Sequence, residues 1–208
     1  MKKAIYTAVI GEYDEIRKPN KVNDDYDYIL FTNLDIESNF WKVVKVEGFG
    51  AKVARKIKIR PDLYLPEYDL TVWLDANIVQ NCDIDDIVDH VESVDMVTMQ
   101  HPSRNCIYQE VEACKSLNKD SALVMDKQVA RYKANGYPED NGLIASGILV
   151  RKNNHTVNKL MKDWWYEVST HSKRDQLSFN YCLSESNVTI NLVSFNVLRT
   201  HFLYLRHK

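Results

Sequence analysis

The sequence predicts an α/β fold in which a mostly parallel sheet is flanked by helices. Three observations support this prediction: short apolar runs of strand length, helical spacing between those runs, and polar residues where apolar runs end. Continuous apolar runs rich in Val, Ile and Leu are typical of parallel strands that are covered on both faces. With 208 residues, the chain suits a single domain, 1–208.

Seven segments have the pattern of strands. Most are short and predominantly apolar, and the first is closed by Gly11. The third alternates apolar and polar residues, which indicates an edge or half-buried strand. In chain order, the expected strands are residues 4–10, 27–33, 41–47, 70–77, 95–100, 142–151 and 188–194.

Six segments have helical patterns. In the first, Val53 and Ile57 face one way, whereas the basic residues Lys52, Arg55 and Lys58 face another. The expected helices are residues 51–60, 83–91, 105–118, 121–135, 154–169 and 174–184. The tail, 195–208, has no pattern that assigns it. Strands and helices therefore alternate, and in such sheets ligands bind beyond the carboxyl ends of the strands.

Composition and motifs exclude several classes of protein. The net charge of −2 provides no overall field for nucleic acid or an anionic membrane. The chain has no apolar run of about 18 residues and no signal-peptide pattern, so we expect no membrane span and a cytoplasmic location. P-loop, dinucleotide-binding, nucleophile-elbow and zinc-peptidase motifs are absent. Four cysteines without CxxC or zinc spacing are expected to be reduced thiols: Cys82, Cys106, Cys114 and Cys182.

The strongest local signal is the tripeptide Asp75-Ala76-Asn77, at the end of an apolar strand. Its two oxygen-bearing side chains can reach one ion if the strand turns there. Hard cations such as Mg²⁺ and Mn²⁺ prefer oxygen ligands and usually share them with substrate phosphates. The alternative for this tripeptide is an Asx turn that binds no ligand.

Charged residues on two expected helices are further candidates. Arg55, together with Lys52 and Lys58, can hold a diphosphate or a sugar hydroxyl, and the alternative is a solvated basic face. The triplet Arg174-Asp175-Gln176 opens the last expected helix. Its carboxylate and amide can bind a sugar and stabilise positive charge at the anomeric carbon. The alternative is that Asp175 only caps the helix.

Three other polar residues are weaker candidates. His201, in the tail, can fold back onto a metal, although a lone histidine is more often a surface or packing residue. His101 and Arg104 follow the expected strand 95–100 and can contact phosphate or sugar. The alternative for this pair is a structural role in the loop.

The order of these signals resembles that of the GT-A glycosyltransferases. In particular, the chain is similar to a bacterial, plant and viral family that was once catalogued as a domain of unknown function and is now called glycosyltransferase-like. The resemblance extends over most of the chain, from about residue 4 to about residue 181. The matching motifs are Ala54-Arg55-Lys56-Ile57, Leu63-Tyr64-Leu65-Pro66-Glu67-Tyr68, Trp73-Leu74-Asp75-Ala76-Asn77, His101-Pro102-x-Arg104-x-Cys106-Ile107-Tyr108, Gly142-Leu143-Ile144-Ala145-Ser146-Gly147 and Arg174-Asp175-Gln176-Leu177-Ser178-Phe179.

This resemblance implies a GT-A fold, a nucleotide-diphospho-sugar donor, a divalent cation (Mn²⁺ or Mg²⁺) and a glycan or glycoprotein acceptor. The implied metal ligands are Asp75, Asn77 and, by analogy with a late histidine of retaining enzymes, His201. Asn77 departs from the D-x-D pattern and removes one negative charge. The implied donor-binding residues are Thr7, Ala8, Val9 and Tyr13 for uracil and ribose, and Arg55, Lys58, Asp75, Ala76, Asn77, His101 and Arg104 for sugar and diphosphate.

The pair Asp175-Gln176 resembles the Asp-Gln pair near the anomeric carbon of retaining GT-A enzymes. It implies a front-face displacement with retention. The family resemblance as a whole implies a hexosyltransferase that uses a UDP-sugar, such as UDP-glucose or a UDP-deoxyhexose. Metal and cations would stabilise the leaving diphosphate, while Asp175 or Gln176, beside Arg174, would stabilise the oxocarbenium-like centre. An inverting enzyme would instead need a carboxylate base, for which Glu110 and Asp175 are the candidates.

Two other functions remain open. One is a catalytically silent nucleotide-sugar-binding module, which the Asn77 departure suggests. The other is a metal-dependent nucleotidyltransferase or phosphohydrolase that uses Asp75. A narrower resemblance is to the glycosyltransferase domains of large algal DNA viruses of the chlorovirus type. It implies a capsid-glycan acceptor, a host-cytoplasmic location and a domain that is one piece of a longer polypeptide.

Overall fold

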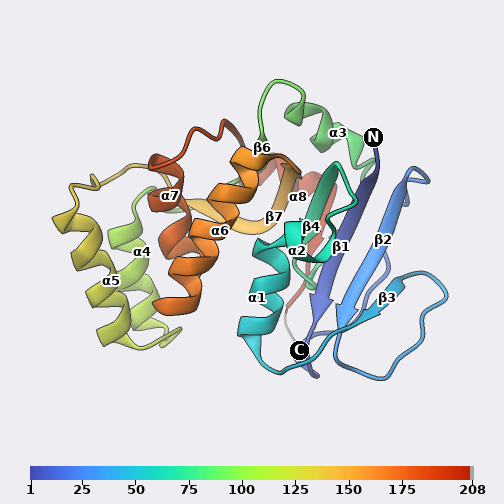
Figure 1. Cartoon of the computed structure of the whole chain (residues 1–208), viewed down its shortest axis with the longest axis horizontal. Helices are drawn as coiled ribbons and strands as arrows, with labels where there is room; N and C mark the ends of the chain where they lie inside the picture. The colour runs from blue at the N-terminus through green and yellow to red at the C-terminus, as the bar shows by residue number, and fades with distance from the viewer. Residues whose placement is uncertain (207–208) are drawn as a thin grey trace.

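The computed structural model describes residues 1–206, apart from the side chains of Val197 and Leu198, so the last two residues of the expected domain lie outside it. Its central sheet has seven strands (Figure 1). In chain order these are β1 (Lys3–Val9), β2 (Tyr26–Thr32), β3 (Lys42–Lys45), β4 (Leu70–Leu74), β6 (Met96–Gln100), β7 (Ile144–Lys152) and β8 (Ile190–Val193). Each corresponds to one of the expected strands.

The strand order across the sheet is β3-β2-β1-β4-β7-β6-β8. All neighbouring pairs are parallel except those that involve β7, which runs antiparallel to both β4 and β6. The prediction of a mostly parallel sheet is therefore confirmed. Because β7 is reversed, its amino-terminal end lies at the same edge as the carboxyl ends of the other strands.

Helices cover the sheet and extend from one side of it. The helical segments are α1 (Ala51–Ile59), α2 (Pro61–Tyr64), α3 (Asp85–Val88), the 3₁₀ turn η1 (Asp89–Val91), α4 (Ile107–Ser116), α5 (Ala122–Ala134), α6 (His155–Thr170), α7 (Gln176–Ser184) and α8 (Phe195–His201). In Figure 1, α1 and α6 lie in front of the sheet, whereas α4 and α5 lie beyond its edge.

Two apolar layers hold the sheet between its covering helices. On one face, Tyr6 and Trp73 pack against α1, α6 and α7, and Trp164 of α6 lies at the centre of this layer. On the other face, Val72 and Leu74 pack against α3, η1 and a short ribbon. Side chains of a strand alternate between the two faces, so neighbouring residues such as Trp73 and Leu74 enter different layers.

The strand expected over 70–77 is shorter in the structure and ends at Leu74. The chain leaves the main sheet after Leu74, turns, and forms β5 (Ile78–Gln80), which pairs antiparallel with β9 (Phe202–Tyr204) of the tail. The turn is closed by the backbone N–H of Ile78, which donates to the carbonyl of Asp75 (2.8 Å). The tail therefore folds back onto the strand end that carries the tripeptide.

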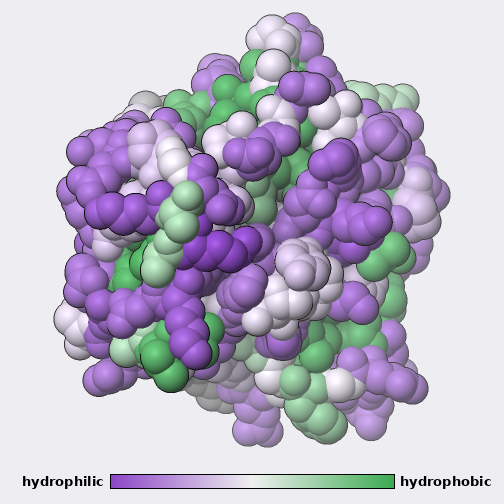
Figure 2. All heavy atoms as spheres, turned by 60° about the vertical axis from the view of Figure 1, so that its left-hand side comes forward, coloured by the Kyte–Doolittle hydropathy of each residue, from purple (hydrophilic) through white to green (hydrophobic). Residues whose placement is uncertain are grey.

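The outer surface of the helices is mainly polar. On the face in Figure 2, hydrophilic side chains dominate and hydrophobic ones occur in small groups. Exposed apolar residues include Leu117, directly after α4, and Leu123, in the first turn of α5. Within residues 1–206, none of the helices has the length and apolar character that a bilayer crossing requires. The four cysteines are free thiols.

Candidate functional site

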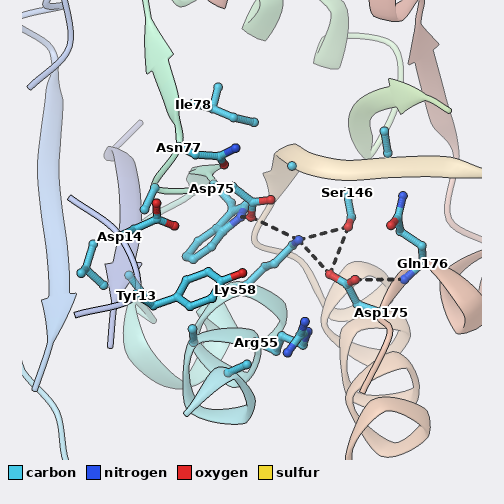
Figure 3. A pocket seen from close by; sticks show the side chains of 18 of the residues that line it. Tyr13, Asp14, Arg55, Lys58, Asp75, Asn77, Ile78, Ser146, Asp175 and Gln176 are labelled. Atoms are coloured by element: carbon cyan, nitrogen blue, oxygen red, sulfur yellow. Dashed lines mark hydrogen bonds and ion pairs between the residues drawn. The ribbon is translucent and has the colours of Figure 1, made fainter. Parts of the chain in front are cut away.

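A cavity of ≈ 430 Å³ lies at the edge of the sheet where the parallel strands end (Figure 3). The ends of β1 and β4, the start of β7, one side of α1 and the start of α7 form its wall. The lining residues are Ala8, Val9, Ile10, Tyr13, Asp14, Gly50, Ala51, Ala54, Arg55, Lys58, Trp73, Asp75, Ala76, Asn77, Ile78, Met99, Ala145, Ser146, Gly147, Arg174, Asp175, Gln176, Phe195 and Tyr204. A cavity of this size, at this edge of an open sheet, is where such folds bind ligands.

Lys58 occupies the centre of the site. Its Nζ lies 2.8 Å from Oδ2 of Asp175 and 3.3 Å from Oδ1 of Asp75, and it donates to Oγ of Ser146 at 3.1 Å. Figure 3 shows the ammonium between the two carboxylates. The residue is only 5% exposed, because α1 packs this side against the sheet edge. The alternative of a solvated basic face therefore does not hold for Lys58.

Helical spacing brings Arg55 to the same cavity as Lys58. Residues 51, 54, 55 and 58 line the cavity and form one stripe of α1, since residues three and four apart share a helix face. Lys52 lies outside this stripe, and its Nζ donates to the carbonyl of Ser169. Nη1 of Arg55 is buried and has no hydrogen-bond partner among the residues that the structure describes. A buried cationic donor of this kind can bind an anionic ligand.

Asp175 both caps a helix and pairs with a cation. Its Oδ1 accepts from the backbone N–H of Gln176 at the start of α7 (3.1 Å), and its Oδ2 accepts from Lys58 and from Ser146 (3.0 Å). Burial alone would raise the pKa of Asp175, but the charges of Lys58, Arg55 and Arg174 lower it well below its usual range. Asp175 is therefore an ionised group at neutral pH. The capping contact forms, and the same side chain also lines the cavity.

Asp75 is oriented by two donors. Its Oδ1 accepts from Nε1 of Trp73 at 2.7 Å and from Lys58. The backbone, and not this carboxylate, closes the turn after β4, so the Asx-turn alternative is not what forms. Oδ2 of Asp75 has no hydrogen-bond partner among residues 1–206, and the side chain is 36% exposed. This oxygen is the one available to a ligand.

Asn77 is tied to the tail. Its Nδ2 donates to the carbonyl of Leu205 (3.0 Å), and its own carbonyl accepts from the N–H of Leu205 (2.9 Å). A carbonyl can only accept, so the amide must present its NH₂ group to Leu205 and keep Oδ1 for other partners. Within residues 1–206, no group of three or more His, Cys, Asp or Glu side chains is placed to hold a metal ion.

Ser146 enters the site through an irregularity in the sheet. The register between β6 and β7 shifts between Thr98 and Met99, so that Met99 pairs with Ala145 rather than with a residue nearer Leu149. In this bulge Gly147 approaches its neighbours closely. A Cβ on Gly147 would lie 2.8 Å from Cδ1 of Ile78 and 3.3 Å from Oδ2 of Asp75. Glycine therefore suits the close approach of β7 to the Asp75 turn, because an added methyl group would have to displace Cδ1 of Ile78.

Arg174 and Gln176 connect the start of α7 to the start of β7 through hydrogen bonds. Nη2 of Arg174 donates to Oε1 of Gln176 (3.1 Å), whose Nε2 donates to the carbonyl of Ile144 (3.1 Å). Nε of Arg174 is buried without a hydrogen-bond partner in the described part of the chain. Asp120 holds the preceding loop, because its Oδ2 accepts from Oγ of Ser172 and N of Lys173.

Four of the predicted site residues do not line the cavity. Thr7 lies on β1 with its side chain toward the opposite face from Ala8, where it lines a separate cavity of ≈ 20 Å³. His101 and Arg104 instead surround the buried Glu110: Nε of Arg104 donates to Oε2 of Glu110, and Nε2 of His101 lies 3.7 Å from the same oxygen. Burial lowers the pKa of His101, and the charge of Glu110 only partly opposes this effect.

His201 is the fourth. Its carbonyl accepts from N of Asn81, at the opposite end of the β5–β9 ribbon from the Asn77–Leu205 pair. Four residues of strand separate these two ends, or roughly 13 Å. The structure therefore does not bring His201 to Asp75 and Asn77.

Some lining residues were not predicted as site residues. Trp73 and Ser146 lie inside the motifs that carry the family resemblance, and this is the one signal that could have identified them. Asp14 lies in the loop after β1, where a polar residue following a strand end was the available clue. Phe195 and Tyr204 come from the tail, whose pattern assigned no structure. The hydroxyl of Tyr204 donates to Sδ of Met99 (2.9 Å), and this contact closes one side of the cavity.

Comparison with known proteins gives a family. The model of the family described as TOD1/MUCI70, glycosyltransferase-like domain, matches residues 1–207. No curated protein matches the chain. Among solved structures, the galactosyltransferase LgtC in complex with donor and acceptor sugar analogs is similar at a TM-score of 0.49 and 9% identity, covering 86% of this chain and 70% of that one. So loose an overall likeness transfers no residue roles.

Proposed function

Because this chain belongs to the TOD1/MUCI70 glycosyltransferase-like family, we propose that it is a hexosyltransferase that moves a sugar from a nucleotide-diphospho-sugar to a glycan or glycoprotein. The donor class is a UDP-sugar such as UDP-glucose or a UDP-deoxyhexose. The observation that supports the proposal best is the Lys58 ammonium between Asp75 and Asp175, beside Arg55, in a cavity of ≈ 430 Å³. Cationic side chains suit a diphosphate, and carboxylates suit sugar hydroxyls.

In this proposal the nucleoside lies over the end of β1. Ala8 and Val9 form an apolar floor there, and Tyr13 is 67% exposed at the cavity rim, where its ring can stack on a base. The diphosphate then lies beside Arg55 and the Asp75 turn. Nη1 of Arg55 lacks a partner among the described residues, and a phosphate oxygen would supply one.

The tripeptide fits Mn²⁺ or Mg²⁺ only as part of a shared site. Oδ2 of Asp75 and Oδ1 of Asn77 are two oxygen ligands, and the described residues contain no group of three or more His, Cys, Asp or Glu side chains that could hold a metal ion by itself. The donor diphosphate and water would have to complete the coordination, as is common for Mg²⁺. A bound cation would supply charge stabilisation to the leaving diphosphate.

We propose transfer with retention. The bond between the anomeric carbon and the phosphate oxygen breaks, the acceptor oxygen bonds to the same face of that carbon, and the acceptor proton passes to the departing phosphate oxygen. Arg55 and Lys58 hold the departing charge, and the Asp175 carboxylate stabilises the positive anomeric carbon. Gln176 and Arg174 hold the start of α7 in place beside it.

The two carboxylates considered as bases for inversion are poorly suited to that task. A general base works best with a pKa near the operating pH, and three cations lower the pKa of Asp175 far from it. Glu110 is outside the cavity lining and is ion-paired with Arg104. Both observations support the retaining alternative.

The first experiment is a thermal-shift panel of nucleoside diphosphates and nucleotide sugars with Mn²⁺, with Mg²⁺ and with EDTA. Ligands that bind the native state raise the melting temperature. Arg55→Ala should remove this shift, whereas Lys52→Ala, on the same helix but outside the cavity, should keep it. If no nucleotide or nucleotide sugar stabilises the wild type under any metal condition, the donor site does not exist.

The second experiment identifies the reaction by its product. A transferase releases a nucleoside diphosphate during slow donor hydrolysis, whereas a nucleotidyltransferase releases pyrophosphate and a phosphohydrolase releases phosphate. Asp75→Ala should abolish the release of nucleoside diphosphate while leaving a cooperative unfolding transition. Donor binding without any turnover in the presence of acceptor glycans would instead favour a silent binding module. His201→Ala should leave the release of nucleoside diphosphate unchanged, because the structure does not bring His201 to Asp75 and Asn77.

A further inference from the structure

Arg151 is buried behind the candidate site without an acidic partner. It lies on β7 and is 1% exposed. Its Nη1 donates to Sδ of Met161 (3.3 Å) and its Nη2 to the hydroxyl of Tyr6, whereas its Nε has no hydrogen-bond partner within residues 1–206. No carboxylate of the described residues lies within ion-pair distance of it. Burying a guanidinium in this way is costly, so the residue needs a reason to be there.

The hydroxyl of Tyr6 connects Arg151 to Lys58. A guanidinium has only donors, so the Tyr6 oxygen must accept from it, and the phenol hydrogen is left for another acceptor. That acceptor is the backbone carbonyl of Lys58, 2.9 Å from the Tyr6 oxygen. Each group in this chain of hydrogen bonds therefore donates to the next, from Arg151 on β7 through Tyr6 on β1 to the Lys58 carbonyl in the last turn of α1. From that turn the side chain of Lys58 extends toward the cavity.

The ring of Tyr6 also contacts the second group that orients Asp75. It packs against Trp73 with the ring centroids 5.1 Å apart and the planes at 69°. Nε1 of Trp73 donates to Oδ1 of Asp75, and Lys58 donates to the same oxygen. Tyr6 thus touches both residues that hold this carboxylate oxygen, while neither Tyr6 nor Arg151 lines the cavity.

We propose that Arg151 and Tyr6 are positioning residues, which fix Lys58 and Trp73 so that the Lys58 ammonium stays between Asp75 and Asp175. Arg151 keeps the phenol hydrogen directed at the Lys58 carbonyl, and this bond fixes the height of the last turn of α1 over the sheet. The effect on turnover rests on the proposed transferase function, whereas the effect on the Lys58 ammonium does not. A purely structural role would instead affect stability alone.

Tyr28 offers a matched control. It is a buried tyrosine on the neighbouring strand β2, and its hydroxyl is also satisfied on both sides: it accepts from N of Asn23 (3.0 Å) and donates to Oε1 of Gln80 (3.1 Å). It belongs to the apolar layer on the other face of the sheet and does not line the main cavity. Tyr28→Phe therefore removes a comparable buried hydroxyl without touching Lys58.

The experiment compares Tyr6→Phe with Tyr28→Phe in the full chain. An amine-reactive reagent and mass spectrometry give the labelling rate of Lys58, and donor hydrolysis gives kcat and KM. We expect a lower melting temperature in both variants, because each loses the two hydrogen bonds of a buried hydroxyl. The loss should be larger in Tyr6→Phe, which also leaves the buried Arg151 guanidinium without this acceptor. Only Tyr6→Phe should raise Lys58 labelling, roughly fivefold, and lower kcat roughly tenfold with KM little changed.

A second pair of variants tests the arginine. Arg151→Lys keeps a donor for Tyr6, so it should stay closer to the wild type in Lys58 labelling than Arg151→Met does.

If Tyr6→Phe matches Tyr28→Phe in labelling rate and in kcat, the positioning role is disproved. If labelling rises in Tyr6→Phe but the wild type never hydrolyses a nucleotide sugar, the positioning role stands and the proposed transferase function fails.

Discussion

Lys58 and Asp175 form a buried ion pair, with 2.8 Å between Nζ and Oδ2, that joins the end of α1 to the start of α7. Each residue is 5% exposed, so neither charge has water as a substitute partner. Removing one member of such a pair leaves the other buried and unpaired, which costs about 3–5 kcal/mol. The pair is therefore both a stabilising contact and the element that holds the site together.

Lys58→Met should lower the free energy of unfolding by about 3 kcal/mol or more, as measured by urea denaturation, and should abolish donor hydrolysis. Lys56→Met is the control: it lies on the same helix but outside the cavity lining, and its effect should stay below about 1 kcal/mol. Equal losses in the two variants would show that Lys58 and Asp175 do not depend on each other.

Asp175 should give the fold a distinct pH dependence. Burial alone would raise its pKa, but the neighbouring cations lower it below that of the unfolded chain. A carboxyl with a lowered folded-state pKa stabilises the fold above its unfolded pKa, about 3.9, and loses this contribution as pH falls through the folded-state value. The gap in unfolding free energy between the wild type and Asp175→Asn should therefore be widest at neutral pH and narrow below about pH 4.

Urea denaturation from about pH 7 down to about pH 3 measures this gap. The matched control is Asp163→Asn, whose partner Lys159 lies on the exposed side of α6 and whose ion pair should contribute little at any pH. A gap that stays constant through the acid range would mean that Asp175 contributes nothing through its charge.

Asn77 should hold the tail against the Asp75 turn through its hydrogen bonds to Leu205. Asn77→Asp would replace the NH₂ group that faces the Leu205 carbonyl by a second oxygen, so the hydrogen bond becomes a repulsion. We expect faster hydrogen exchange at the Leu205 amide and a loss of about 1 kcal/mol in stability. Restoring the D-x-D pattern would thus loosen the tail even though it adds a negative ligand.

The control for this change is Asn81→Asp, at the other end of the same ribbon. Oδ1 of Asn81 accepts from Nδ2 of Asn20 (3.1 Å), and an aspartate oxygen can accept in the same way. Exchange at Leu205 should therefore stay at the wild-type rate in this variant. If hydrogen exchange at the Leu205 amide is also unchanged in Asn77→Asp, Asn77 does not hold the tail in place.

Gly147 should be sensitive to a single methyl group. A Cβ there would meet Cδ1 of Ile78 at 2.8 Å and Oδ2 of Asp75 at 3.3 Å. Gly147→Ala should cost about 1–3 kcal/mol and also weaken the nucleotide-induced thermal shift, because it crowds the oxygen that faces a ligand.

The double variant Gly147→Ala, Ile78→Val separates these two effects. Valine lacks the Cδ1 atom, so the packing clash is relieved while the contact with Asp75 remains. Stability should recover toward the wild type, whereas the thermal shift by nucleotide should not. If stability and the thermal shift both recover, the effect of Gly147→Ala comes entirely from the clash with Ile78.

Local pattern was enough to predict the seven strands of the main sheet, most of the helices and the strand-end tripeptide. Segments such as 27–33 and 51–60 are specified by their own apolar spacing, so β2 and α1 form within a few residues of the expected limits. A ligand site at the carboxyl edge follows from an alternating α/β order. For the same reason Asp75 and the Asp175 triplet could be chosen as candidates before their distance was known.

Long-range packing decided the rest. The sequence marks Lys58 as one of several basic residues on a helix face, and only the packing of α1 against β1 and α6 buries it between two carboxylates. The reversed direction of β7 brings Ser146 into the site, and the register of β5 with β9 puts Leu205, not His201, beside Asn77. Such pairings join segments far apart in the chain, so no local spacing encodes them.

The sequence by itself therefore determined the α/β class, the strand that ends in Asp75, and the candidate residues on α1 and α7. The tertiary structure decided which of them meet. Strand and helix periodicity are properties of neighbouring residues, whereas the face that Thr7 turns to, the burial of Lys58 and the position of the tail depend on which surfaces are covered when the chain packs.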